Sequence, residues 1–390
     1  MSRAYFTPYG VGLGHASRLI MVAEILKKYD VNVRFSSFGE AASYIVMNGY
    51  DCNRVPPLDF AWSAEGGFSI KNSIANIPRW LMNFSRQVNC ETVSLAQFNP
   101  EIVVSDSRLS SVLTAKLLGI PAIVLLNQIK LLLSPRLRQF KMARSFEKIN
   151  GEFLGLLWTT ADKILVPDLP PPYTIAECSI WDTDSVTKKL QYIGFTSPRS
   201  CVSVERINEA LKILSFTLSD PIVFIHISGP TETRIPIAKI AIEACRALHS
   251  NIQYVISEGS PMGTHTPKKL AGSGWYYEWC PIRDEIFAMS DLVVLRGGHA
   301  AITQAVQFGK PIISIPIANH GEQIGNSEKI SKIGSAIMIK GKQPTPKEIT
   351  DAIHRIIDDT AFKKKAEELF EVSLKFNGID NVVNIIRSYI

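Results

Sequence analysis

The sequence lacks the long apolar segments and paired cysteines that mark membrane-spanning or disulfide-rich proteins. Its longest apolar runs, such as IPAIVLLN, fall well short of the ~20 residues that a spanning helix needs. The start, MSRAYFTPYG, has no apolar core of the kind found in signal peptides. The six cysteines form no CxxC pair, which favours reduced, buried thiols over disulfides or a zinc site. We therefore expect a cytoplasmic protein without a metal.

The sequence also has little excess charge. A net charge of +6 over 390 residues is compatible with phosphates, nucleic acid or an acidic lipid surface as partners, and does not choose among them. The basic residues are not interleaved with aromatic residues on a recognisable module, so we expect no nucleic-acid binding. With 46% hydrophobic and 20% charged residues the chain is globular. Its length predicts two domains, because single cores rarely grow beyond ~250 to 300 residues.

Short β-branched runs, each followed by a helical pattern, occur in two sets along the chain. This alternation predicts two α/β domains, each with a doubly wound parallel sheet. The Gly-, Pro- and Ser-containing stretch from Gly194 to Ser203 is a predicted linker. We predict Rossmann-like domains at residues 1–197 and 198–375, with a last helix at about 376–390 that packs back on the first domain. The predicted strands are Ala4–Phe6, Val31–Ser36, Ile102–Ser105, Ala122–Leu126, Lys163–Val166, a strand near Tyr192, Ile222–Ile227, Ile252–Ser257, Trp275–Tyr277, Leu292–Leu295, Pro311–Ile315 and Ala336–Ile339.

The first predicted strand leads into the glycine-rich sequence PYGVGLGHASR, which precedes an amphipathic helix. Ligands bind at the carboxyl edges of parallel strands, and the glycines let the backbone turn tightly and bring His15 to this edge. A dinucleotide site is a poor fit, because Glu40 comes too late after the second strand. The alternative is a glycine turn whose histidine only hydrogen-bonds the backbone.

A second charged group follows the strand in PEIVVSD. An aspartate that is hydrogen-bonded to a histidine fixes its tautomer and stabilises the imidazolium, so His15 as general base and Asp106 as its partner are a candidate dyad. The alternative is that Asp106 only caps the helix Arg108–Leu118.

In the second half, the sequence HISGPTETR ends a strand and opens a helix. Ser228, the amide of Gly229 and Thr231 suit a phosphate at a helix N-terminus, although Glu232 opposes an anion there.

The sequence LRGGHAAITQ is a further strand, glycine turn and helix, and GKPIISIP and NHGEQIGN follow it. Gly297, Gly298 and His299 can offer amides to a diphosphate. Glu322 and Gln323 can hydrogen-bond several hydroxyls of a sugar.

Together, the segments RGGH, GKPIISIP and HGEQIGN resemble the donor-binding signature of GT-B glycosyltransferases. The similarity is to the UDP-glucuronosyltransferase-like enzymes and to the bacterial transferase that adds N-acetylglucosamine to make lipid II, in glycosyltransferase families 1 and 28. The GxGHxxR start and the SGPTETR loop are similar to archaeal and bacterial members. The resemblance implies an acceptor-binding and then a donor-binding Rossmann-like domain, facing a central cleft.

The resemblance further implies an inverting, metal-independent transfer of N-acetylglucosamine or another hexose. The co-substrate would be a UDP-sugar, the acceptor a hydroxyl, and no cofactor is implied. His15 would be the general base and Asp106 its partner. Gln304 stands where many relatives have a glutamate that grips the ribose, which weakens the assignment of UDP. The implied donor-binding residues are Gly14, Ser228, Gly229, Thr231, Trp279, Cys280, Arg296, Gly297, Gly298, His299, Gln304, Asn319, His320, Glu322 and Gln323.

Only the composition of two segments gives an indication of the acceptor. The stretch Asn127–Trp158 is basic and amphipathic, which suits an anionic membrane surface and a lipid or polyprenyl-linked acceptor. The alternative is an ordinary helix with a solvated face, because Glu147 and Glu152 dilute the charge. Residues 59–80 are rich in aromatics and glycine and form a candidate acceptor loop. The basic residues of the stretch are Lys130, Arg136, Arg138, Lys141, Arg144 and Lys148.

Two other functions remain open at this point. A nucleotide-sugar epimerase on the same two domains would need more carboxylates than these loops contain. A non-catalytic nucleotide-sugar-binding subunit of a membrane-associated complex would need neither His15 nor the pair Glu322 and Gln323. Release of nucleoside diphosphate only in the presence of an acceptor would distinguish a transferase from both.

Overall fold

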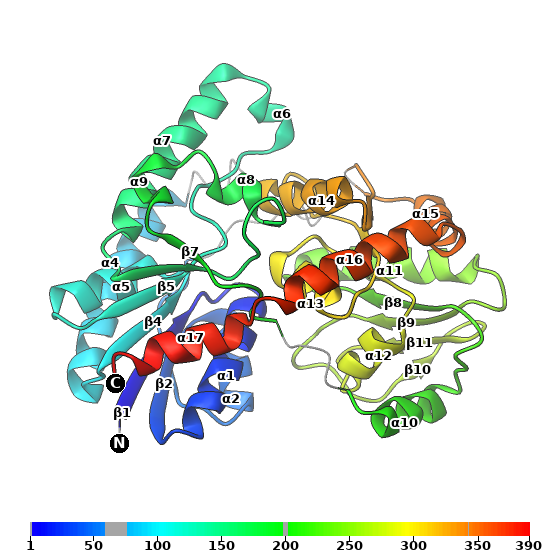
Figure 1. Cartoon of the computed structure of the whole chain (residues 1–390), viewed down its shortest axis with the longest axis horizontal. Helices are drawn as coiled ribbons and strands as arrows, with labels where there is room; N and C mark the ends of the chain where they lie inside the picture. The colour runs from blue at the N-terminus through cyan, green and yellow to red at the C-terminus, as the bar shows by residue number, and fades with distance from the viewer. Residues whose placement is uncertain (1, 59–75, 198–201, 342) are drawn as a thin grey trace. The chain divides into compact units, whose positions relative to one another are not determined.

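The computed structural model describes residues 2–58, 76–197, 202–341 and 343–390, and forms two compact α/β units (Figure 1). One unit contains the described residues up to Thr196 together with Phe376–Ile390, and the other contains those from Ser197 to Lys375. Residues 59–75 of the predicted acceptor loop and 198–201 of the predicted linker lie outside the described residues.

The first unit has a seven-stranded sheet in the order β3-β2-β1-β4-β5-β6-β7, and every pairing in it is parallel. Its strands are β1 Ser2–Pro8, β2 Val31–Ser37, β3 Cys52–Arg54, β4 Ile102–Asp106, β5 Ala122–Leu125, β6 Lys163–Val166 and β7 Leu190–Tyr192. Its helices are α1 Gly14–Lys27, α2 Gly39–Met47, α4 Ile77–Phe98, α5 Leu109–Leu117, α6 Pro135–Arg138, α7 Lys141–Trp158, α8 Glu177–Ile180, α9 Asp184–Thr187 and α17 Gly378–Arg387.

Alternation along the strands of this sheet divides its core into two layers. Phe6 packs with α1, whereas its neighbour Tyr5 packs on the opposite face. Helix α17 joins the α1 layer through buried Val382 and Ile386, and lies beside α1 in Figure 1.

The second unit also has seven strands, in the order β10-β11-β9-β8-β12-β13-β14. All pairings are parallel except that of β10 with β11. Its strands are β8 Ile222–His226, β9 Gln253–Ser257, β10 Lys268–Lys269, β11 Gly274–Tyr277, β12 Leu292–Leu295, β13 Ile312–Ser314 and β14 Ala336–Met338. Its helices are α10 Val204–Leu214, α11 Thr231–Arg246, α12 Arg283–Met289, α13 His299–Gln307, α14 Gly321–Ile333, α15 Pro346–Asp358 and α16 Thr360–Leu374.

The predicted fold class, two doubly wound parallel sheets, is confirmed. Two edge strands, β3 and β10, were not predicted. Strand β3 is the short sequence CNR, and β10 consists of two exposed lysines, so neither shows the apolar alternation by which strands are recognised.

Both sheets begin in the middle and wind outward in both directions. The order reverses between β1 and β4 in the first unit, and between β8 and β12 in the second. The loops that leave two such neighbouring strands diverge to opposite faces, and open α/β sheets bind their ligands at this place.

Among the described residues, no helix is both long enough and apolar enough to cross a membrane. The same part of the chain groups no three His, Cys, Asp or Glu side chains in a way that could hold a metal ion. The five described cysteines are free. Cys245 and Cys280 are buried, whereas the other three are only half-buried, so the prediction of buried thiols holds for two of them.

Candidate active site

The glycine turn after β1 places His15 in the first turn of α1. Gly12 has φ +71°, and a Cβ at Gly10 would lie 2.3 Å from the ring of Phe38, so the turn needs glycine at both positions. The ring of Tyr9 stands edge-on to His15, with centroids 5.9 Å apart. The side chain of His15 remains 23% exposed, so the imidazole is oriented and still accessible.

Asp106 lies beside His15 because β1 and β4 are neighbours. Their register pairs Pro8 with Asp106, and His15 Nδ1 lies 2.7 Å from Asp106 Oδ1. The alternative role as a helix cap is wrong. Helix α5 starts after Arg108 without a side-chain cap, and the Arg108 amide donates to Ser105 Oγ instead (3.1 Å).

Arg18 is a third member of this group that the residue patterns did not single out. One turn after His15 on α1, its Nη2 donates to Asp106 Oδ1 at 2.5 Å, and its Nε pairs with Oδ2 of the same carboxylate. The same Nη2 lies 3.3 Å from Asn127 Oδ1. The arginine of the GxGHxxR motif was the available signal, since residues three apart share a helix face.

These contacts decide the charge of Asp106. Burial by itself would raise the pKa of this carboxyl, but Arg18 and His15 more than offset that effect and hold the pKa at about 2. His15 Nδ1 lies 2.7 Å from this ionised carboxylate, which can only accept, and 2.9 Å from Arg18 Nη2, which can only donate. We assign the proton to Nδ1 because the carboxylate is the closer partner, so that Nδ1 donates to Asp106. Nε2 of the imidazole then carries the free lone pair and can accept a proton.

In the second unit, the turn between β12 and α13 is packed tightly at one glycine and open at the next. Gly297 has φ +79°, and a Cβ there would lie 2.5 Å from Ser327 Oγ and 2.9 Å from the Gln323 carbonyl oxygen. A Cβ at Gly298 would meet nothing within 4 Å. Gly298 is the N-cap of α13, and as a glycine it has no side chain that could cap the helix. His299, which is buried, is the first residue of the helix.

The loop between β8 and α11 is the neighbour of this turn, because β8 pairs with β12. Ser228 and Gly229 are half-buried, and Gly229 has φ +120°. Thr231 opens α11, and buried Arg234 donates to its Oγ1 at 2.9 Å. Glu232, which opposes an anion, is exposed.

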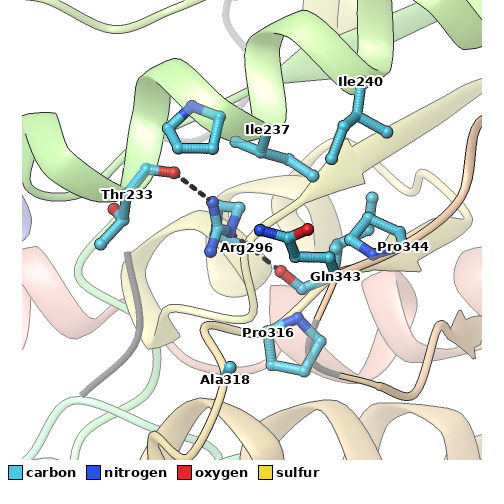
Figure 2. A pocket seen from close by; sticks show the side chains of 10 residues that line it. Thr233, Ile237, Ile240, Arg296, Pro316, Ala318, Gln343 and Pro344 are labelled. Carbon is cyan, nitrogen blue, oxygen red and sulfur yellow. Dashed lines mark hydrogen bonds between the residues drawn. The ribbon is translucent and has the colours of Figure 1, made fainter. Parts of the chain in front are cut away.

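The side chain of Arg296 hydrogen-bonds the backbone of two neighbouring segments of the second unit. Its Nη1 donates to the Thr233 carbonyl at 2.8 Å and its Nε to the Ile315 carbonyl at 3.0 Å, while the side chain lines a small pocket with Ile237 and Pro344 (Figure 2). Burial lowers the pKa of its guanidinium to about 10, so it stays charged at neutral pH. Arg296 therefore ties the end of β12 to α11 and to β13.

The loop before α14 uses two of the predicted donor residues to shape its own backbone. Asn319 has φ +63°, and His320 is the N-cap, whose Nδ1 accepts from the Gln323 amide at 3.4 Å. Burial lowers the pKa of His320, which favours the neutral acceptor form. The Oε1 of Gln323 accepts from the Ile317 amide at 2.9 Å. Glu322 lies half-buried in the first turn of α14.

One further predicted position, Gln304, contacts an acid that sequence reasoning missed. Gln304 Nε2 donates to Asp284 Oδ1 at 3.2 Å, so a carboxylate stands beside the glutamine. Trp279 is half-buried after β11. Burial raises the pKa of the Cys280 thiol to about 12, so it is not a nucleophile at neutral pH. The sequence CPIRDE shows the acid, but only the fold places it next to Gln304.

Comparisons with known proteins identify the fold and the class of reaction. Residues 3–146 match the glycosyl transferase family 1 model, and residues 239–377 match the glycosyltransferase family 28 C-terminal domain. An uncharacterised glycosyltransferase of Methanosarcina mazei is 26% identical over 370 residues, which are 95% of this chain and 93% of that protein. The chain is a GT-B glycosyltransferase.

Two other similarities extend the comparison of this glycosyltransferase. The UDP-N-acetylglucosamine–N-acetylmuramyl-(pentapeptide) pyrophosphoryl-undecaprenol N-acetylglucosamine transferase of Glaesserella parasuis is 23% identical over 154 residues, or 39% of this chain and 42% of that protein. The structure of a spinosyn rhamnosyltransferase complexed with thymidine diphosphate superposes with a TM-score of 0.67 at 16% identity, covering 99% of this chain and 100% of that one. The glycosyltransferase therefore transfers a sugar from a nucleotide-sugar donor.

Proposed function

We propose that this glycosyltransferase inverts the configuration of the transferred sugar, with His15 as the general base. The observation that carries the proposal is the group of His15, Asp106 and Arg18 at the place where the order of the first sheet reverses. Nε2 of His15 takes the proton of the acceptor hydroxyl as its oxygen attacks the anomeric carbon. The bond from that carbon to the diphosphate breaks in the same step, and its electron pair leaves with the diphosphate.

Asp106 and Arg18 have separate parts in this proposal. The carboxylate of Asp106 holds the Nδ1–H tautomer and stabilises the imidazolium that forms. Arg18 keeps that carboxylate ionised and fixed in its buried position, because its guanidinium binds both oxygens.

The donor is assigned to the second unit. The amides of Gly298 and His299 and the first turn of α11 at Thr231 lie at neighbouring strand ends, and would stabilise the departing diphosphate without a metal. Trp279 and Cys280 would lie near the nucleobase of the donor, and Gly14 would lie near the transferred group. Glu322 and Gln323 would hydrogen-bond the sugar hydroxyls. Asp284 beside Gln304 supplies the carboxylate that a ribose diol would need.

We further propose UDP as the donor nucleotide and N-acetylglucosamine or another hexose as the sugar. The Glaesserella parasuis relative is named for UDP-N-acetylglucosamine, whereas the spinosyn rhamnosyltransferase holds thymidine diphosphate. Both diphosphates are therefore worth testing, with UDP first. The acceptor is a hydroxyl group, and we favour one on a lipid-linked or polyprenyl-linked glycan.

Inversion can be tested before the acceptor is known, because water can replace it as a slow nucleophile. The enzyme at high concentration is mixed with UDP-N-acetylglucosamine, whose anomeric bond is α, and the released sugar is followed by proton NMR. Direct displacement predicts that the β-anomer appears first and then mutarotates. Initial release of the α-anomer would show retention and contradict the proposal, and the His15→Ala variant should release neither anomer above background.

A further inference from the structure

Helix α7 carries an apolar row on the side that faces away from its own unit. The row consists of Met142, Phe146, Ile149, Phe153 and Leu156, and spacings of four and three residues place them on one helix face. Their exposed fractions lie between 51% and 86%. A contiguous exposed apolar surface of this kind marks a place of interaction.

The opposite face of α7 is fixed firmly, so the apolar row cannot turn inward. Its buried residues are Glu147, Gly151, Gly155 and Trp158, and it packs against α9. A Cβ at Gly155 would lie 2.3 Å from Ser185 Oγ, so the glycine is what allows this close approach.

A row of positive charge accompanies the apolar row. Lys141 and Lys148 are exposed on α7, seven residues apart and on one flank of the apolar row, and Arg136 is exposed on α6. Arg144 is exposed as well, but its spacing from the buried Gly151 places it on the opposite face of α7. Every exposed charged residue of these two helices is basic. We call the apolar row together with Lys141, Lys148 and Arg136 the α7 surface.

Of the two acids that dilute the charge in the sequence, one is buried in an ion pair and the other remains half-buried near Lys148. Glu147 is buried, pairs with Arg138 at 3.0 Å and accepts from the Leu133 amide at 2.7 Å. Glu152 accepts from the two backbone amides that begin α9, at 2.7 and 2.9 Å, and these bonds lower the pKa of its carboxyl. Lys130, which is basic in the sequence, does not contribute to the surface charge, because its side chain is buried and donates to the Trp181 carbonyl.

We propose that the α7 surface binds an anionic lipid bilayer. The apolar row enters the boundary between headgroups and acyl chains, and the basic row reaches the lipid phosphates beside it. A second copy of this chain is a poorer occupant, because a two-fold interface across the row would bring equal basic rows together. The proposal goes beyond the transfer reaction and does not depend on it.

The apolar row is tested by flotation of the full-length protein with vesicles of equal parts phosphatidylglycerol and phosphatidylcholine. The wild type should float with these vesicles, and F146S/F153S should bind at least roughly tenfold more weakly, because the two phenylalanines that would enter the bilayer are lost. The matched control is L117S/L218S, which removes two exposed leucines elsewhere and should bind like the wild type. Equal binding of the wild type and F146S/F153S would overturn the proposal.

The basic row is tested by charge. Binding should fall in pure phosphatidylcholine vesicles, at high salt and in K141Q/K148Q, whereas K363Q/K364Q, which neutralises two exposed lysines of α16, should leave it unchanged. Analytical ultracentrifugation without vesicles completes the test. A wild-type dimer that F146S/F153S dissociates would assign the row to self-association and overturn the lipid assignment. Because every readout is binding without substrate, failure here leaves the reaction mechanism untouched.

Discussion

Replacing His15 with alanine should lower turnover by about two to four orders of magnitude and leave the dissociation constant for nucleoside diphosphate nearly unchanged. The imidazole is 23% exposed and bound to Asp106, so its loss removes the proton acceptor. The donor is assigned to the other unit, where no side chain changes. Turnover is measured by release of nucleoside diphosphate, and affinity by isothermal titration.

The matched control is His249→Ala, because His249 is an exposed histidine that lies between α11 and β9, at the opposite edge of the second sheet from the loops of the proposed site. It should retain wild-type turnover. If His15→Ala also retained wild-type turnover, His15 would have no part in the chemistry. If it lost donor affinity to the same degree as turnover, the assignment of separate acceptor and donor units would be wrong.

Substitutions of the two adjacent glycines after β12 should have very different effects on stability. Gly297→Ala introduces a Cβ 2.9 Å from a backbone oxygen at φ +79°, and should lower the free energy of unfolding by about 2 to 4 kcal/mol. Gly298→Ala introduces a Cβ into open space at φ −65°, and should change it by less than about 0.5 kcal/mol. Urea unfolding of both variants measures the difference.

The affinity for nucleotide should also distinguish Gly298→Ala from Gly297→Ala. The new methyl group of Gly298→Ala stands where the diphosphate would approach the amides, so affinity should fall at least about tenfold in a protein of normal stability. Gly298→Ala with normal stability and normal affinity would move the diphosphate away from this turn. A Gly297→Ala variant as stable as the wild type would contradict the packing of the turn beneath α14.

The glycine-rich loops could be predicted from sequence because their signal is local. A strand, two or three glycines and a helix occur together within PYGVGLGHASR and LRGGHAAITQ, so His15 and Gly297 could be assigned to strand ends. Asp106 could be predicted in the same way, from the strand that precedes it. The structure adds the short distance between His15 and Asp106, which depends on strand order and not on any single segment.

Contacts between distant segments could not be predicted. Arg18 reaches a carboxylate 88 residues away, and Gln304 meets Asp284 across a helix and a strand. The burial of Glu147 on α7 was equally hidden, since only the fold shows that this acid turns inward. Pairing partners depend on the tertiary structure, whereas a helical pattern gives only the face.

Binding of a nucleoside diphosphate to the second unit is the claim on which the account of this glycosyltransferase depends, and a thermal-shift panel tests it most directly. The purified protein is heated with UDP, thymidine diphosphate and their sugar conjugates in turn. A ligand at ~100 times its dissociation constant adds about 2.7 kcal/mol of stability, so UDP and one UDP-sugar should raise the melting temperature clearly. If no nucleotide shifted the melting temperature at millimolar concentration, the assigned donor site would be contradicted.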